Sequence, residues 1–333
     1  MKTKAISTVI ASILMLMIVI ALGGTAYLYV SGTFTSKTAI SFEIIDSVND
    51  TVVIRNSGTE QITRITATLD DNPENIAVVP NIDGLVAYWS FNEGSGSTTD
   101  DNSDNNNVGT LQPACGDCLS WGNGRFNSAL KFDGDGGYVN IIDSPSLDLG
   151  SDMTILAWLK PVNAGTLQHT LGKRLGCGGP GIRYMLVLSE GKLVFASAPG
   201  SQVLSISTLK SDVWTLVAAT VKLIGPVNAQ VKLYINGNFD NQGDVVLDPP
   251  NNAPLRIGTA GNCPPPQNFK GIIDEVSMYN KVLSESEIKQ LYSGLIPSGQ
   301  LAKVKPLTPL SKGTHTLRLC TSSMCNTAIL TII

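Results

Sequence analysis

Short runs of alternating apolar residues, bounded by Gly, Asn or Asp, recur from Leu85 to Ser293 and constrain the fold of this chain more than any other feature. Alternation with a period of two is typical of half-buried β-strands, and the bounding residues are those that tight turns favour. The clearest runs are 85–91, 129–133, 137–141, 153–160, 213–222, 229–236 and 269–279. We therefore predict a two-sheet antiparallel sandwich for this part of the chain.

The composition of the 333 residues excludes several classes of protein. Hydrophobic residues make up 43% and charged residues 15%, so the chain can bury a core and is not generally disordered. A net charge of −4 with no cluster of Lys or Arg argues against nucleic acid as a partner. His169 and His315 are the only histidines, so the chain lacks the histidines that most histidine-dependent hydrolases and metalloenzymes require. We therefore expect a protein that is not an enzyme.

Six segments stand in the order found in a known fold. They are 88–96, 101–111, 124–134, 154–159, 231–237 and 271–280. Their order and content resemble the laminin-G-like, concanavalin A-like jelly roll, and the resemblance implies such a domain over residues 83–296. After the last strand, Ser284 and Glu287 form a capping-box pattern that predicts a short helix to about Ser293.

The resemblance also implies a lectin-like function, the binding of a glycan or a protein, in many such domains with the help of Ca²⁺. Acidic positions of the family match Glu93, Asp101, Asp133 and Asp274, and carboxylate oxygens suit calcium. The alternative is that these residues bind only their own backbone in turns. Glucan hydrolases of related folds alternate two carboxylates along one strand, whereas Asp274 and Glu275 are adjacent, so no catalytic residues are predicted.

The N-terminus predicts a segment that meets a membrane. Lys2 and Lys4 precede a run without charged residues, and 6–30 is long enough to cross about 30 Å of hydrocarbon as a helix. Three interpretations are open: a signal peptide removed near Ala26, a permanent single-span anchor, or the N-terminal helix of a pilin-like subunit. The two lysines predict a precursor in the cytoplasmic membrane with its N-terminus inside.

A short basic leader followed by Ala5 and an apolar start at Ile6 resembles the class III signal peptides of archaeal type IV pilins. The resemblance implies cleavage between Ala5 and Ile6 by a prepilin peptidase, with a leader over 1–5. It also implies a long filament-core helix over 6–37 and assembly into a helical homopolymer by membrane machinery.

Further strand-like runs flank the jelly roll. They cover 39–46, 50–56 and 61–70 before it, and 314–319 and 328–333 after it. Neither group is large enough to bury a core alone, so we predict that 38–82 and 297–333 form one small β-sandwich headpiece interrupted by the jelly roll. The predicted fold class is mostly β with one long N-terminal α-helix.

Six cysteines in a chain expected outside the cytoplasm predict up to three disulfides. The spacing suggests a hairpin staple between Cys320 and Cys325 and a local bridge between Cys115 and Cys118. Cys177 and Cys263 are then left for each other. The pattern Asn49-Asp50-Thr51 is an N-glycosylation acceptor in a turn.

These observations lead to one functional hypothesis. We expect a structural subunit of an extracellular type IV pilus-like filament at the cell surface, whose lectin-like domain mediates adhesion or contact between filaments. Its ligand would be an unknown glycan or surface protein. The alternatives are a membrane-anchored carbohydrate- or protein-binding receptor that does not polymerise, and a secreted carbohydrate-active enzyme with its signal peptide removed.

Overall fold

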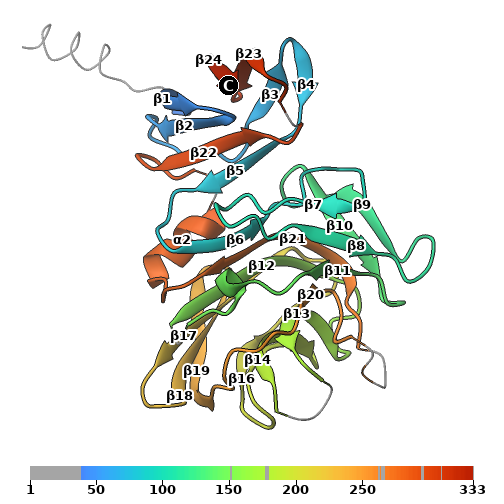
Figure 1. Cartoon of the computed structure of the whole chain (residues 1–333). Helices are drawn as coiled ribbons and strands as arrows, with labels where there is room; N and C mark the ends of the chain where they lie inside the picture. Colours follow the sequence, from blue (N-terminus) through green and yellow to red (C-terminus); the bar gives the residue numbers. More distant parts are fainter. Residues whose placement is uncertain are drawn as a thin grey trace, which may run out of the picture.

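The computed structural model describes residues 39–332, apart from residues 151, 177–179, 262, 264–266, 294–295 and 309. The described chain forms two β-sandwiches, one above the other in Figure 1. The smaller is built from the two ends of this stretch, and the larger from the middle. The smaller has two four-stranded sheets, and the larger has two eight-stranded sheets.

The small sandwich mixes strands from before and after the large one. In its first sheet the strands follow the order β1 (Phe42–Val48), β2 (Thr51–Asn56), β22 (Leu301–Pro306) and β5 (Ile76–Pro80). In its second sheet they follow the order β24 (Cys325–Ile332), β23 (Gly313–Cys320), β3 (Thr66–Leu69) and β4 (Asn72–Glu74).

Alternation along these strands builds the small core. Val52 and Ile54 of β2 are fully buried, as are Leu317 and Leu319 of β23, while the residues between them are more exposed. β22, which follows the large sandwich in the sequence, pairs with both β2 and β5, which precede it. The first sheet therefore needs strands from both parts of the chain.

The large sandwich consists of two sheets that we name after their central strands. The β21 sheet contains β19 (Asn238–Val246), β18 (Asn228–Ile235), β17 (Thr215–Leu223), β12 (Met153–Pro161), β21 (Lys270–Tyr279), β10 (Ser128–Asp133) and β9 (Leu119–Asn123), and β6 (Leu85–Trp89) also pairs with β21. The β13 sheet contains β16 (Gln202–Thr208), β15 (Lys192–Ala196), β14 (Ile182–Ser189), β13 (Gln168–Arg174), β20 (Leu255–Ile257), β11 (Tyr138–Ile141), β8 (Gly109–Gln112) and β7 (Thr98–Thr99).

One apolar core fills the space between these two sheets. Ile155 and Ile273 of the β21 sheet and Leu171, Leu186 and Ile257 of the β13 sheet are all fully buried in it. The alternate residues of each strand therefore point to the outer face of their sheet.

The outer face of the β21 sheet is covered by α2 (Glu285–Ser293), beside which the small sandwich also packs (Figure 1). The helix begins with the predicted capping box, because the Ser284 amide donates to Glu287 Oε2 at 2.7 Å and the Glu287 amide donates to Ser284 Oγ at 3.3 Å. Leu283 and Ile288 bury against Trp158 of β12. The other helical element is the single 3₁₀ turn η1 (Pro145–Leu147).

The predicted long N-terminal α-helix needs correction. The one α-helix among the described residues is α2, whose nine residues span about 14 Å at 1.5 Å per residue, less than half of a bilayer core. No helix in this part of the chain is both long and apolar enough to span a membrane. Residues 1–5 and 6–37, including the predicted cleavage site at Ala5 and Ile6, lie outside the described residues. The predicted membrane-inserted precursor with its N-terminus inside is therefore also withdrawn.

Disulfides join two of the predicted pairs. The Cys320–Cys325 bridge closes the β23–β24 hairpin with a Cα–Cα distance of 4.1 Å, and Cys115–Cys118 closes a loop between β8 and β9 with a distance of 5.3 Å. Cys263 is also disulfide-bonded, while its predicted partner, Cys177, lies outside the described residues.

Candidate functional site

The outer face of the β13 sheet carries a row of side chains contributed by four neighbouring strands. The strand register aligns Met185 of β14, Gly172 of β13, Arg256 of β20 and Asn140 of β11. The residues flanking these positions, such as Leu171 and Ile257, point into the core. The row therefore lies on the side of the sheet away from the core. We call this surface the β13 face.

Arg256 lies at the centre of the β13 face. Its Cζ is 5.8 Å from the centre of the Tyr138 ring, which is a cation–π distance. Gly261 also lies close to this guanidinium: a Cβ added to it would lie 2.5 Å from Nη1, and its φ is +81°. A side chain there would collide with Arg256 and strain the backbone, so glycine lets the loop pass close to the guanidinium.

Arg174 follows a β-bulge in β13, so its contact with Met185, rather than strand alternation, places it on the same face. Its side chain is largely buried, its Nε donates to the carbonyl of Gly176 at 2.8 Å, and its Nη1 lies 3.9 Å from Met185 Sδ. Burial lowers the pKa of Arg174, but a guanidinium keeps its charge in proteins.

His169, at the start of β13, is held at the same face by a β-bulge. It pairs with Val187 before the register shifts, and its Nε2 lies 2.8 Å from Gln267 Oε1. Its Nδ1 is buried and has no hydrogen-bond partner among the described residues. Burial, followed by the positive charge of Arg174, lowers the pKa of His169 to about 4. The imidazole is therefore neutral at physiological pH.

The four predicted calcium ligands do not converge. Asp101 accepts hydrogen bonds from its own turn and from β6: its two oxygens accept from the amides of Ser103, Asn107 and Tyr88 at 2.9 Å each and from Asn107 Nδ2 at 2.8 Å. This arrangement matches the turn alternative for Asp101.

The other three carboxylates have separate local partners. Glu93 Oε1 accepts from the Asp100 amide at 2.9 Å, Asp133 Oδ1 accepts from the Asp135 amide at 2.8 Å, and Asp274 Oδ2 accepts from the Arg125 amide at 2.7 Å. Burial raises the pKa of Glu93, and burial followed by repulsion from Glu275 raises the pKa of Asp274 well above its ordinary value.

Among the described residues, three potential metal ligands lie close together only at Cys115, Cys118 and Asp133, and the two sulfurs are already joined in a disulfide. The four carboxylates together therefore do not fit a calcium site. Calcium binding remains a prediction from the family resemblance. Asn49, the predicted glycosylation position, is exposed in the turn between β1 and β2 with φ +52°.

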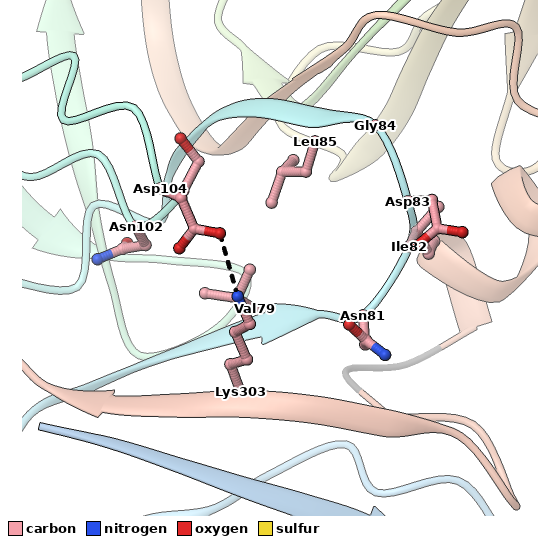
Figure 2. Close-up of a pocket in the computed structure, with 10 residues that line it drawn as sticks. Val79, Asn81, Ile82, Asp83, Gly84, Leu85, Asn102, Asp104 and Lys303 are labelled. Atoms are coloured by element: carbon pink, nitrogen blue, oxygen red, sulfur yellow. Dashed lines mark hydrogen bonds and ion pairs between the residues drawn. The ribbon is translucent and has the colours of Figure 1, made fainter. Parts of the chain in front are cut away.

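A second candidate lies at the junction of the two sandwiches, where a cavity of about 190 Å³ separates residues 79–85 from 102–104. Figure 2 shows Lys303 of β22 reaching across to Asp104, with which it forms an exposed ion pair of 3.2 Å. Beside it, the Tyr88 hydroxyl lies 3.1 Å from the Val78 carbonyl and contacts the Glu275 carboxylate. These groups join the two sandwiches to each other, whereas β13, β14 and β16 lie at the far end of the molecule from the small sandwich (Figure 1). We therefore take the β13 face as the better ligand site.

The residues of the β13 face form no pattern in the sequence that indicates a binding site. Tyr138 and Asn140 fall in a predicted strand, but the strands that carry Arg174, Met185 and Arg256 were not predicted. Basic residues on separate short strands leave no local pattern, and only the sheet topology brings them together.

Comparisons with known proteins support the jelly roll. Residues 133–289 match the profile of the concanavalin A-like lectin/glucanases superfamily. The binding domain of Paraclostridial Mosquitocidal Protein 1 matches with a TM-score of 0.50 and 20% identity over 63% of this chain and 52% of that one, so the chain spans about half of that domain. No curated protein matches the chain.

Two further structures are similar at lower TM-scores. Domain 4 of AbnA, an extracellular arabinanase from Geobacillus stearothermophilus solved with arabinotriose, has a TM-score of 0.47 and 23% identity over 62% of this chain and 98% of that one. The binding domain of botulinum neurotoxin serotype D has a TM-score of 0.48 and 16% identity over 63% and 51%. At these identities the likeness concerns the fold alone. The profile match over residues 133–289, together with the two-sheet topology, shows that the chain contains a concanavalin A-like jelly-roll domain.

Proposed function

We propose that the jelly roll is a lectin-like module that binds a glycan on the β13 face. The observation that carries this proposal is the Arg256–Tyr138 pair, in which a guanidinium with unused donors lies beside an aromatic ring on an accessible part of the sheet. Ligand sites combine apolar or aromatic surface with a few polar groups that converge on it. The half-buried Met185 adds apolar surface to the same face.

A glycan array probed with the full chain tests this proposal. The wild-type protein is expected to bind a subset of glycans, and Tyr138→Ala is expected to lose at least tenfold in apparent affinity for them. Arg318→Gln, which changes an exposed arginine of the small sandwich, is the matched control and is expected to bind as wild type does. Equal binding by Tyr138→Ala and wild type would remove the β13 face from consideration.

We also propose that the module binds glycans without cleaving them. Asp274 and Glu275 form the one adjacent pair of acidic residues in the jelly-roll sheets, and both are engaged away from the β13 face: Asp274 by the 125–126 turn and Glu275 by Tyr88. Incubation of a bound oligosaccharide with the chain is expected to release no new reducing ends.

At a finer level, we propose that residues 38–82 and 297–333 form one headpiece of a subunit in an extracellular pilus-like filament, with the jelly roll displayed for adhesion or contact between filaments. The support is the interleaving of β22 and β5 in one sheet, the disulfides, which suit an oxidising compartment, and the sequence resemblance at Ala5 and Ile6. Display in many copies would strengthen weak glycan binding through avidity.

N-terminal sequencing and negative-stain microscopy of native surface material test the finer proposal. A chain that begins at Ile6 in a filamentous sample is expected. A mature N-terminus beyond Ala26, or single subunits that retain Met1, would contradict the filament and favour a secreted or anchored binding protein.

A further inference from the structure

Arg174 and Arg256 of the β13 face lack acidic partners, whereas the other two buried cations are compensated. Arg183 donates to the carbonyls of Asp248, Leu149 and Gly150 at 2.6–2.7 Å, and Lys173 has acidic partners. Lys173, between Gly172 and Arg174, is fully buried and contacts Asp143 directly, with Asp148 at 3.2 Å. Among the ion pairs of the described residues, none includes Arg174 or Arg256. Every Asp and Glu of the sequence belongs to the described part of the chain, so no carboxylate side chain has been left out of this comparison.

The arginines also have unused hydrogen-bond donors. Arg256 makes no hydrogen bond to any described residue, and its Nε is buried. Arg174 donates from Nε to the Gly176 carbonyl, which leaves its Nη2 without a partner in the described structure. A partly buried guanidinium without a counter-ion is costly, and an anion that accepts from its planar set of N–H groups would offset that cost.

Asn140 and His169 add polar groups without charge to the face. Asn140 is half-buried, and His169 is buried, neutral at physiological pH, and faces the Gln267 oxygen through Nε2. The aromatic ring of Tyr138 lies beside Arg256 and offers an apolar surface.

We infer that the β13 face recognises an acidic glycan, whose carboxylate or sulfate group pairs with Arg256 and Arg174. This inference rests on the proposed glycan-binding function and adds the chemical class of the ligand. Arginine forks match both carboxylate and sulfate oxygens, so the two sources share one recognition chemistry.

Isothermal titration of the full chain with three oligosaccharides of similar length tests the inference. The probes are trigalacturonic acid for the carboxylate, a chondroitin sulfate tetrasaccharide for the sulfate, and maltotriose as the neutral control. At least one acidic probe is expected to bind tenfold or more tightly than maltotriose, and to weaken as salt rises from 50 to about 300 mM because the contact is between charges. The probe that binds more tightly identifies the anionic group.

Variants locate the contact. Arg256→Gln and Arg174→Gln are each expected to weaken the acidic probe at least tenfold, while Arg318→Gln leaves binding unchanged. Arg256→Lys, which keeps the charge but loses the fork, is expected to fall between wild type and Arg256→Gln. It also provides the comparison if a glutamine variant fails to fold, as judged by circular dichroism.

The outcomes separate this inference from the proposed function. Equal binding of acidic and neutral probes, or acidic binding that all three arginine variants of the face retain in full, overturns the inference and leaves glycan binding intact. Failure of the chain to bind any glycan on an array that includes acidic and neutral members overturns the proposed function together with the inference.

Discussion

At the residue scale, the neighbouring cations Lys173 and Arg174 differ in whether they have acidic partners. Lys173 is enclosed at one end of the sandwich, where it contacts Asp143 and also donates to the Ala253 carbonyl at 3.0 Å. Arg174, the next residue, has no acidic partner in the described structure. A buried charge is tolerated when paired, so we assign Lys173 to folding and Arg174 to binding.

Replacement of Lys173 by Met is expected to lower the free energy of unfolding by about 2–3 kcal/mol, because Asp143 and Asp148 would lose their shared counter-ion. The value is at the low end for buried pairs because both carboxylates are partly exposed. Urea denaturation measures the change, with Lys222→Met at an exposed position as the control. A loss no larger than that of the control would contradict the assignment.

The Glu275 carboxylate gives the stability of the chain a pH dependence. Burial raises its pKa to about 8, from an ordinary value of 4.5. Between these values the folded chain holds a proton that the unfolded chain has released, so stability falls as the pH rises from about 4.5 to about 8. The pKa of Asp274 is raised as well, and it acts in the same direction.

Glu275→Gln, which resembles the protonated carboxyl, is therefore expected to flatten this dependence and to be more stable than wild type at pH 8. Thermal unfolding between pH 5 and 9 measures the effect, with Glu60→Gln at an exposed position as the control. A variant whose pH profile has the same slope as wild type would show that Glu275 is not the titrating group.

At the element scale, the sequence predicted those strands that have one face in solvent. It also predicted the start of α2, because the capping box involves residues close together in the sequence. The predicted runs 129–133 and 229–236 correspond to β10 and β18. In β13, two β-bulges and buried polar residues interrupt the alternation. Strands β14 and β15 gave no signal because part of their outer face is covered: Val187 and Val194 of that face are as buried as core residues. Without a polar face, period-two alternation is lost.

Site residues, too, could be predicted only where the sequence carries a local pattern. The family resemblance suggested Asp101 as a calcium ligand, but its carboxylate accepts hydrogen bonds from amides of its own turn and of β6. Arg256 had no local signal, because its importance depends on Gly172 and Tyr138 being adjacent in the sheet rather than in the sequence.

The capping box of α2 makes a separate prediction. Ser284→Ala removes the hydroxyl that accepts from the Glu287 amide, and a lost N-cap of this kind costs about 1 kcal/mol. Urea denaturation is the measurement, with the exposed Ser322→Ala as control. Equal stability of the two variants would show that α2 does not depend on this cap.

At the scale of the whole molecule, the two sandwiches have separate cores and a polar junction. The small core needs β22 and β23 from the end of the chain, whereas the large core uses only residues between them and β5. The Lys303–Asp104 pair and the Tyr88–Val78 contact connect the two. This organisation suits an inserted module whose binding does not depend on its carrier.

Removal of residues 301–333 is therefore expected to unfold the small sandwich and to leave the jelly roll folded. Scanning calorimetry of the full chain should show two transitions, and the truncated chain should keep only the transition of the jelly roll. Loss of both transitions on truncation would mean that the two sandwiches fold as one unit.

The most direct measurement of the central claim is a crystal structure of the chain with the oligosaccharide that binds most tightly on the array. We predict that the sugar lies on the β13 face, within hydrogen-bond distance of Arg256 and against the Tyr138 ring. Density for the sugar in the junction cavity beside Lys303, or around the turn of Asp101, with an empty β13 face, would contradict the account.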